Sequence, residues 1–171
     1  MYLMHLSYGD KSSRRKCWDF ACKHNLVGLA DPEDRVNEDW FEFKRKHGED
    51  ENKKLIGDAR FQQLKLFCED MKVEDIVVIM AGEDRLLGIG LLGEYWYEPR
   101  YHSKRGGEFF SHVREVKCWI RRMEYDEAIS FHIPEGYAFK RTIRKIERDK
   151  DSELWNKLTR QDIGEVKKGS S

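Results

Sequence analysis

The sequence predicts an α+β fold, in which a small, curved and mostly antiparallel β-barrel is flanked by helices. Three observations predict this fold. Two apolar segments, residues 76–80 and 86–97, are separated by a short turn that contains glycine, as in a β-hairpin. The first half of the chain alternates strand-like and helix-like segments, whereas the second half is rich in strand-like segments. Glycines inside residues 86–97 indicate a bulge, a tight barrel bend or a close backbone contact.

The first half of the chain contains both helical and strand patterns. Trp18, Ala21 and Cys22 have helical spacing, and a serine before them can cap the helix that they predict. Phe61 and Leu64 begin a second apolar stripe of the same kind. The predicted elements are a strand at 2–8, a helix from Ser12 or Ser13 to about His24, a strand at 26–30, a helix at 36–47, a charged, mobile loop at 48–54 and an amphipathic helix at 58–71.

The second half is dominated by strand patterns. Residues 76–80 are continuously apolar, as in a buried strand, and the alternation of Val116, Cys118 and Ile120 predicts another strand. The predicted elements are strands at 76–80 and 86–97 joined by a turn at 82–85, a long loop at 98–111, strands at 112–122 and 128–133, a helical segment marked by Ile143, Ile146, Leu154 and Leu158, and a frayed end over the last eight residues.

The chain of 171 residues is long enough for one domain with a buried core. We predict a domain over residues 1–148 and a C-terminal helix or linker tail over residues 149–171. No apolar run approaches 18 residues, the N-terminal segment lacks the apolar core of a signal peptide, and four cysteines form no dense framework. We therefore expect a cytoplasmic protein that does not bind a membrane. Scarce Gln and Asn beside abundant Lys, Arg and Glu are typical of thermophiles.

The charge of the chain is balanced overall but divided along its length. The formal net charge is zero, from 32 basic and 32 acidic residues. Residues 1–30 carry five basic and two acidic side chains, residues 31–99 carry ten and eighteen, and residues 100–148 carry twelve and seven. A fold that brings the first segment beside the third would have a basic face, and a polyanion needs only such a local patch. Charge that segregates along solvated helices and loops explains the division equally well.

Motifs for nucleotide and metal chemistry are absent or out of context. The sequence has no P-loop, and the GxGxxG string at residues 88–93 lies inside a predicted strand rather than at the start of a helix. Cys17, Cys22 and His24 are of metal-ligating types but lack a second cluster. The ExK segment at residues 42–44 is typical of metal-dependent nucleases, although a solvated helix face explains it better. We therefore expect no cofactor, no metal and no catalytic residue.

An aromatic segment at residues 95–97 leads into a basic loop. Aromatic rings interleaved with Lys and Arg suit stacking on an exposed base together with neutralisation of phosphate. Rings that pack the ends of the barrel are the alternative, and composition alone favours it. The residues concerned are Tyr95, Trp96, Tyr97, Arg100, Lys104, Arg105, Phe109 and Phe110.

The stretch KVEDIVVIMAGEDRLLGIGLLGEYWYEP, followed by HVREVKCWI, resembles the EVE/YTH-like branch of the PUA-like superfamily. It looks most like the N-terminal recognition domains of archaeal and bacterial McrB-type restriction ATPases. The strand, the helix with Trp18 and the segment at residues 27–31 follow the same order, so the resemblance covers roughly residues 2–147. The matching residues are Asp75, Ile76, Val77, Val78, Gly82, Leu87, Gly88, Ile89, Gly90, Gly93, Tyr95, Tyr97, His112, Arg114, Val116 and Trp119.

The resemblance implies a PUA-like barrel that binds nucleic acid and accepts a modified, for example methylated, base in an aromatic pocket after the base flips out of the stack. Leu29 stands where the family usually has a Trp, so the pocket is expected to be reshaped, filled by its own side chains or tuned to a different base. The implied pocket residues are Ser7, Tyr8, Asp10, Leu29, Ala30, Tyr95, Trp96, Phe109 and Phe110.

By the same resemblance, the chain is a binding module for modified or foreign DNA without chemistry of its own. In the full-length protein, an AAA+ motor ring and a separate nuclease subunit would be its partners, so we expect this chain to be a piece of a longer one. Two alternatives remain: an RNA-binding PUA-like module and a stand-alone metal-dependent nuclease. The expected contacts to phosphates are Lys11, Arg14, Arg15, Lys104, Arg105, His112, Arg114, Lys140, Arg141 and Arg144.

Overall fold

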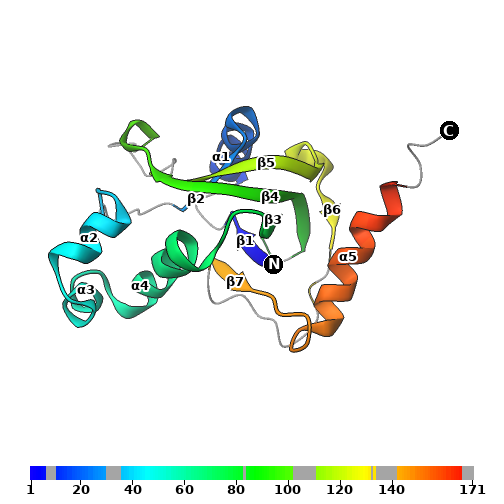
Figure 1. Cartoon of the computed structure of the whole chain (residues 1–171). Coiled ribbons are helices and arrows are strands. Elements are labelled where there is room, and N and C mark those ends of the chain that lie inside the picture. Colours follow the sequence, from blue (N-terminus) through cyan, green and yellow to red (C-terminus); the bar gives the residue numbers. More distant parts are fainter. Residues whose placement is uncertain are drawn as a thin grey trace.

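The protein is an α+β fold around one curled sheet, as predicted (Figure 1). The computed structural model describes residues 1–6, 11–29, 36–82, 84–101, 111–131, 133 and 142–166, with the backbone alone over 161–166. The sheet has the strand order β2-β5-β4-β3-β1-β7, and β6 pairs with β4. The strands are Tyr2–His5 (β1), Leu26–Leu29 (β2), Ile76–Met80 (β3), Arg85–Tyr97 (β4), His112–Arg122 (β5), Ile129–Ser130 (β6) and Ile143–Lys145 (β7).

Five α-helices and three shorter helical segments surround the described part of the sheet. None of the described helices combines the length and the apolar character that a membrane crossing requires. The α-helices are Lys11–His24 (α1), Trp40–Lys46 (α2), Glu49–Ile56 (α3), Asp58–Lys65 (α4) and Ser152–Val166 (α5). The shorter segments are a π-helix at Leu66–Asp70 (η1) and 3₁₀ turns at Pro99–Tyr101 (η2) and Tyr125–Glu127 (η3).

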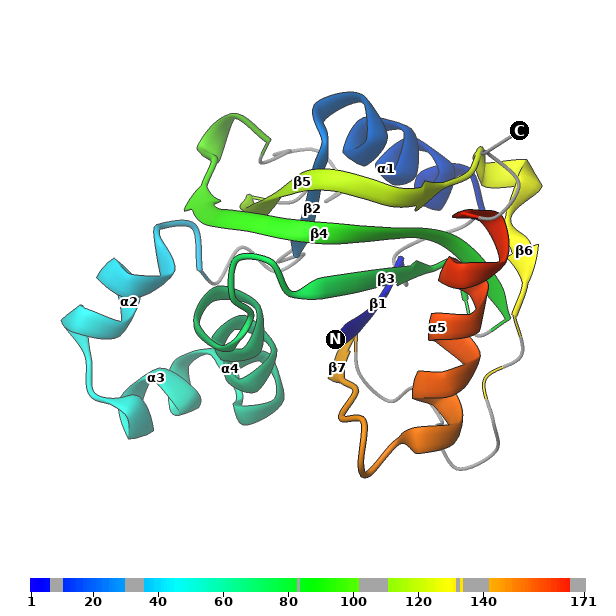
Figure 2. The ribbon, with the colours of Figure 1, turned by 45° about the vertical axis from the view of Figure 1, so that its right-hand side comes forward.

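The sheet is mostly antiparallel and curls into a half-barrel (Figure 2). Only β1 and β3 pair in parallel among the described strands. The register between β4 and β5 shifts at three places, and each shift adds local bending, as the glycines of β4 predicted. The closed barrel that the sequence predicted is not formed by the described strands, because β2 and β7 end the ladder without pairing to each other.

The two faces of the sheet carry separate hydrophobic cores. Along β1, Tyr2 and Met4 enter a core that α1 to α4 cover, whereas Leu3 enters a second core. Leu154 and Leu158 of α5 complete the second core against β3 and β4. Helix α5 is therefore packed on the sheet, and Figure 2 shows it along the face opposite to α1.

Most predicted elements are confirmed, but two are wrong. The predicted loop at 48–54 is the helix α3, whose acidic first turn and basic last turn suit the helix dipole and whose Ile56 is buried. The helical segment predicted from Ile143 to Leu158 is confirmed at Leu154 and Leu158, which lie in α5, and wrong at its start, which is the edge strand β7. Its outer edge is bonded by the Gln63 amide, which accepts from the Ile143 N–H at 2.8 Å and donates to the Ile143 carbonyl at 3.3 Å. The side chain thus replaces a missing neighbouring strand.

Arg114 joins the sheet to the end of the α4–η1 helix from the interior. Its side chain is only 4% exposed, and its guanidinium donates four hydrogen bonds to main-chain carbonyls. Nε donates to Phe67 at 2.7 Å, Nη1 to Gly93 at 3.0 Å, and Nη2 to Cys68 at 3.1 Å and Met71 at 2.6 Å. Burial lowers the pKa of the guanidinium, which still stays charged at neutral pH. The prediction that Arg114 contacts phosphate is therefore wrong, because the residue is buried and four of its five N–H donors are bonded to main-chain carbonyls.

We predict that Arg114→Lys lowers the free energy of unfolding by about 3 kcal/mol, because an ammonium has three donors on one nitrogen and lacks the planar fork that reaches four carbonyls from three nitrogens. Urea unfolding measures the effect. If the variant instead keeps its stability and binds DNA more weakly, Arg114 contacts phosphate, as the sequence suggested.

The buried His5 makes stability depend on pH. Burial lowers the pKa of its imidazole to about 4, and a hydrogen bond to the main chain of Gly82 acts weakly in the opposite direction. The unfolded chain binds this proton below about pH 6.5, whereas the folded chain stays neutral down to about pH 4. We predict full stability above pH 6.5 and a loss of about 3 kcal/mol as the pH falls to 4. Urea titrations across this range measure the slope, and His5→Gln should remove this part of it.

Candidate functional site

Ten of the residues predicted from the resemblance lie outside the described residues, so the structure does not place them. They include six pocket residues and four phosphate contacts. The pocket residues are Ser7, Tyr8, Asp10, Ala30, Phe109 and Phe110, and the phosphate contacts are Lys104, Arg105, Lys140 and Arg141.

Leu29 and His112 lie in the interior instead of at a base pocket or a phosphate, and Tyr95 is partly buried beside them. Leu29 is 1% exposed and pairs with His112, which is fully buried. A carbonyl can only accept, so Nε2 of His112 donates to the Val36 carbonyl at 3.1 Å. In the neutral ring, Nδ1 then accepts from the Tyr95 hydroxyl at 3.0 Å, and that hydroxyl accepts from the Trp40 N–H at 3.2 Å. This chain of bonds fixes the end of β4 to α2. The predictions for Leu29 and His112 are corrected, whereas the one for Tyr95 stays a prediction.

The remaining described predictions have partners within the fold. Trp96 is partly buried and packs against the first core. Arg15 forms an ion pair with Asp126 and lies over the Tyr125 ring, and Lys11 lies 3.9 Å from the same Asp126. The guanidinium of Arg14 lies near Gly82 and that of Arg144 is paired with Asp151 at 3.0 Å. Of these, Lys11 and Arg15 keep exposed side chains at the start of α1.

The described flanks of the predicted pocket lie far apart in the sheet. Leu6, beside the Ser7–Asp10 loop, bonds through its N–H to the Met80 carbonyl, next to the start of β4. Leu29 pairs with His112, which is next to Tyr97 at the other end of β4. The described residues therefore do not gather into one aromatic pocket in the way that the resemblance implied.

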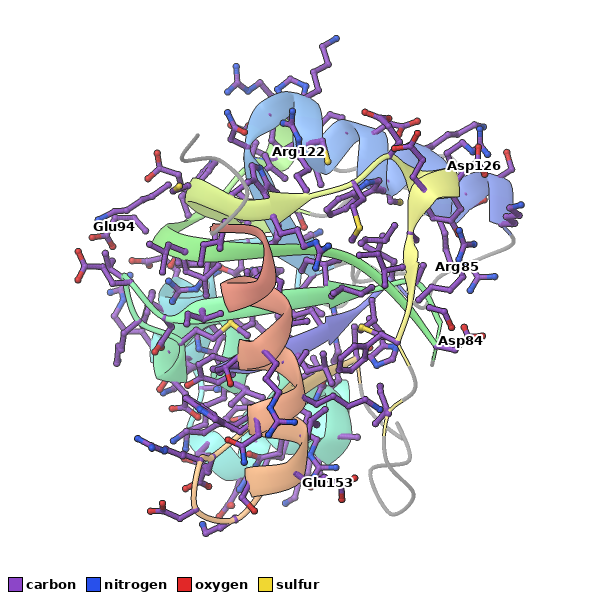
Figure 3. All side chains as sticks on the ribbon, turned by 90° about the vertical axis from the view of Figure 1, so that its right-hand side faces the viewer. Asp84, Arg85, Glu94, Arg122, Asp126 and Glu153 are labelled. Atoms are coloured by element: carbon purple, nitrogen blue, oxygen red, sulfur yellow. The ribbon has the colours of Figure 1, made fainter. Side chains whose placement is uncertain are left out.

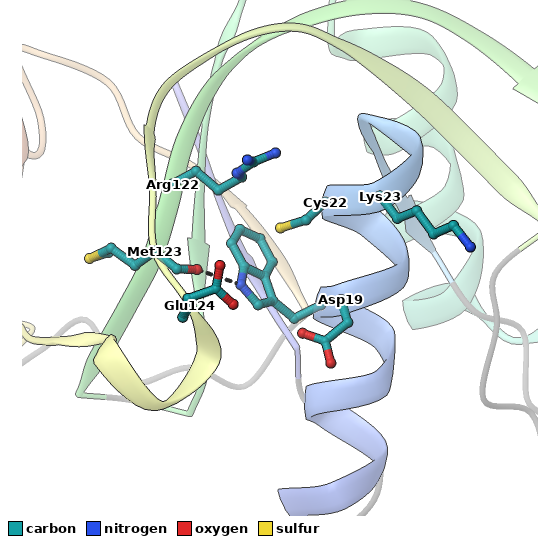
Figure 4. Close-up of a pocket in the computed structure, with 7 residues that line it drawn as sticks. Asp19, Cys22, Lys23, Arg122, Met123 and Glu124 are labelled. Atoms are coloured by element: carbon teal, nitrogen blue, oxygen red, sulfur yellow. Dashed lines mark hydrogen bonds between the residues drawn. The ribbon is translucent and has the colours of Figure 1, made fainter.

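A pocket of about 340 Å³ lies between α1 and the chain that leaves β5. Its lining residues come from two consecutive turns of the helix and from the three residues at the end of the strand. Figure 4 shows the two walls, with Cys22 on the helix and Met123 opposite to it. The Trp18 indole N–H donates to the Met123 carbonyl at 2.8 Å and so joins the two walls. The lining residues are Trp18, Asp19, Cys22, Lys23, Arg122, Met123 and Glu124.

Two glycines of β4, Gly88 and Gly90, leave room for the tryptophans beneath this pocket. A Cβ on Gly88 would lie 2.7 Å from Trp18 and 3.1 Å from Trp119, and a Cβ on Gly90 would lie 3.3 Å from Trp119. The two indoles meet edge to face with centroids 5.3 Å apart. Trp18 is 1% exposed, whereas Trp119 is partly exposed and donates to the Asn25 amide oxygen at 3.2 Å. The glycines of the GxGxxG string are thus packing glycines.

The pocket is polar at its rim and carries both signs of charge. Asp19 and Glu124 supply carboxylates, and Lys23 and Arg122 supply cations. No ion pair joins any of these four to a described residue. Burial raises the pKa of the Cys22 thiol to about 12, so the thiol itself is neutral at physiological pH. Among the described residues, no group of three or more metal-ligating side chains is present.

The surface around the pocket is basic. Helix α1 carries five Lys and Arg residues against one acidic residue, and the exposed end of β5 adds further cations. The pairing of β2 with β5 brings residues 26–29 beside residues 112–115 and so places α1 and the third segment of the chain close together. Figure 3 shows Arg122 close to α1, while Glu153 lies at the far end of α5. The exposed cations of α1 and β5, which we call the α1–β5 face, are Lys11, Arg15, Lys16, Lys23, Lys117 and Arg122.

From the sequence, Trp18 is predicted only as a core residue, and Trp119 only matches the pattern of the family that the chain resembles. Neither residue is predicted to lie at a pocket. The signal in the sequence that could have indicated the packed rings is the pair of alternate glycines, Gly88 and Gly90. Alternate glycines on a central strand leave space for rings from other elements. The charged lining could not be found in the same way, since Asp19 and Glu124 are distant in sequence and meet only in the fold.

The fold and the site define a class of α+β proteins, in which a half-barrel sheet holds a polar pocket against its first helix. Within this class, the chain belongs to the family described as a domain of unknown function (DUF8426), which matches residues 4–146. The matched region includes every residue that lines the pocket. Neither the curated proteins nor the solved structures provide a match.

We predict that Gly88→Ser lowers the free energy of unfolding by about 1–3 kcal/mol, because the new side chain displaces Trp18 or Trp119. Chemical unfolding followed by tryptophan fluorescence measures both the stability and the change around the rings. Gly48→Ser is the matched control, since no atom lies within 4 Å of a Cβ at Gly48 and serine suits this helix N-cap. Equal losses in the two variants would contradict the packing role of Gly88.

Proposed function

We propose that this chain is a nucleic-acid-binding module that recognises DNA. In this proposal the fold is a PUA-like domain of the EVE/YTH-like kind, and the module serves a McrB-type system that restricts modified or foreign DNA. The chain itself supplies binding, and its partners in a longer protein, an AAA+ motor and a separate nuclease subunit, supply work and cleavage. The observation that carries the proposal is the pocket of mixed charge set within the basic α1–β5 face.

The basic face supports contact with a phosphate backbone. Lys23 and Arg122 stand at the pocket on different elements, and both lack an ion pair with any described residue. Lys16 and Lys117 are exposed on the same two elements. Cations on a helix and on an adjacent strand can follow phosphates on either side of one nucleotide, and each contact releases counterions from DNA. The net charge of zero does not oppose this, because the acidic residues concentrate elsewhere in the chain.

The pocket supports the recognition of one base outside the stack. Its volume of about 340 Å³ is within the range of small-molecule sites. Unstacking a base costs a few kcal/mol, and contacts along a ring edge and an aromatic neighbour can offset that cost. Trp119, which packs against Trp18 without lining the pocket, supplies a partly exposed ring beside it. The pocket thus takes the part that the resemblance gave to residues near Leu29.

We predict that the chain binds a fluorescent DNA duplex with an affinity that falls steeply with salt, because cations replace condensed counterions. Lys23→Glu combined with Arg122→Glu should weaken binding by about tenfold or more at low salt and reduce the salt slope. Lys54→Glu, an exposed change on α3, is the control and should leave the affinity almost unchanged. Fluorescence polarisation between 50 and 200 mM salt, roughly the span over which phosphate contacts are lost, measures all three proteins.

The same assay separates DNA from RNA and plain from modified bases. Matched duplexes, unmodified or methylated at adenine or cytosine, are compared with an RNA of the same sequence. Tighter binding of the methylated DNA supports the restriction role. Preference for the RNA would favour an RNA-binding PUA-like module, since the 2′-OH is the group that distinguishes the two. Binding that does not respond to salt would contradict the proposal.

A further inference from the structure

We infer that His24, at the end of α1, stacks on one unpaired base of the bound nucleic acid, while Phe20 and Tyr101 hold its ring in place. The inference rests on the proposed function, because it names a side chain through which that function would contact a base. It concerns the flank of α1 that faces η2 and not the pocket, since none of the three rings lines the pocket. None of the three belongs to the residues that the resemblance implied.

Three rings from two elements meet on this flank. Phe20 and His24 are one turn apart on α1, and their ring centroids lie 4.4 Å apart with the planes tilted by 41°. Tyr101 of η2 meets Phe20 edge to face at 4.9 Å and lies 5.8 Å from His24. Phe20 and Tyr101 are partly buried and pack against the first core, whereas His24 is exposed. The cluster is therefore anchored in the interior and ends at the surface in an imidazole.

The imidazole of His24 is positioned by ring contacts alone. No hydrogen bond or ion pair joins it to another residue in the part of the chain that the structure describes. A ring that is held before binding loses little side-chain freedom when a base stacks on it, so more of the stacking energy remains as affinity. Histidine is among the aromatic side chains that stack on unstacked bases, and every base offers such a face. We therefore expect this contact to accept any base.

Cations border the ring cluster. Lys16 lies one turn before Phe20 in the same row of α1, Lys23 directly precedes His24, and both lysines are exposed. Figure 4 shows the Lys23 side chain directed away from the pocket. Lys23 and His24 also offset the partial negative charge of the helix end, which would otherwise repel a phosphate. An aromatic ring among cations is the combination with which proteins hold unpaired nucleotides, because it serves the base and the phosphates together.

The surroundings of the rings disfavour other ligands. A cation over the rings would meet Lys23 as a like charge. An apolar protein partner would need a wider apolar surface than one flank of rings. The large apolar side chains that are exposed in the described ranges lie on other elements, α2, α3 and β5, and are Phe41, Leu55 and Ile120. An unpaired nucleotide offers both an aromatic face and an anionic phosphate, and so matches the rings and the cations.

Duplexes with one bulged position test this inference, because a bulge offers a base that is already unpaired. The full chain is titrated by fluorescence polarisation with a perfect duplex, with the same duplex carrying one bulged adenosine, and with the same duplex carrying an abasic bulge. The abasic bulge keeps the backbone and lacks only the base. We expect the adenosine bulge to bind about fivefold or more tightly than the abasic bulge, because stacking adds to the phosphate contacts.

Variants of His24 separate stacking from charge. His24→Ala should reduce this ratio to below about twofold and leave the affinity for the perfect duplex almost unchanged, because only a stacked ring is lost. His24→Phe should keep the ratio, since phenylalanine supplies a ring without polar atoms. His47→Ala is the matched control and should keep the ratio as well. His47 also lies beside a phenylalanine, with its ring centroid 6.4 Å from that of Phe43, but it stands at the end of α2.

The outcomes distinguish the two proposals. Equal affinities for the two bulged duplexes, with salt-dependent binding of the perfect duplex, overturn the inference and leave the proposed function standing. A preference that survives His24→Ala also overturns the inference, because other residues, such as those of the pocket, then hold the base. Equal losses in His24→Ala and His24→Phe overturn it too, since they assign a polar contact in place of stacking. Failure of every probe to bind overturns the proposed function itself.

Discussion

The burial of the Arg114 guanidinium is the contact on which the arrangement of this protein depends. A guanidinium cannot lose its charge, so the interior must supply acceptors for its donors. The largest group of unpaired carbonyls that a chain offers is the end of a helix, which also carries partial negative charge. The π-helix η1 ends beside Arg114, and its carbonyls at Phe67 and Cys68 accept hydrogen bonds from the guanidinium. Together with the bond to Gly93, these contacts fix α4 against β4 and β5 at one end of the half-barrel.

This constraint leaves the other end of the same face to α1. Because the α4–η1 helix covers β4 near Gly93, the stretch around Gly88 and Gly90 is covered by other side chains. Two indoles cross the strand there, one from α1 and one from β5, since no Cβ stands in their way. The Trp18 side chain therefore lies between α1 and the end of β5 and separates the two. The pocket is therefore a direct consequence of glycines on the strand beneath it.

Local patterns in the sequence predicted most strands and helices but missed the strand β7 and the helix α3. The apolar run of β3 and the alternation of β5 gave their bounds correctly, because a strand's pattern depends on its own faces. Ile143 and Ile146 suggested one helical stripe, yet they enter different cores, as a spacing of three does on extended chain. Arg114 and His112 seemed available to phosphate because their partners are main-chain carbonyls and a distant hydroxyl, which leave no trace in residue types.

The unpaired charges of the pocket cost the folded protein little and leave it able to bind. Asp19 and Lys23 are four residues apart on α1, with the acidic residue first, which is the favourable order for an ion pair on a helix. They do not pair, and Figure 4 shows their side chains directed apart. Such a pair would stabilise the helix by only about 0.3–0.5 kcal/mol, so its absence costs the folded protein little. A ligand can then bind each group without first breaking an ion pair. A ligand with both an anionic and a hydrogen-bond-donating part would gain the separate interactions of both, whereas a ligand of one sign would gain one and be repelled by the other.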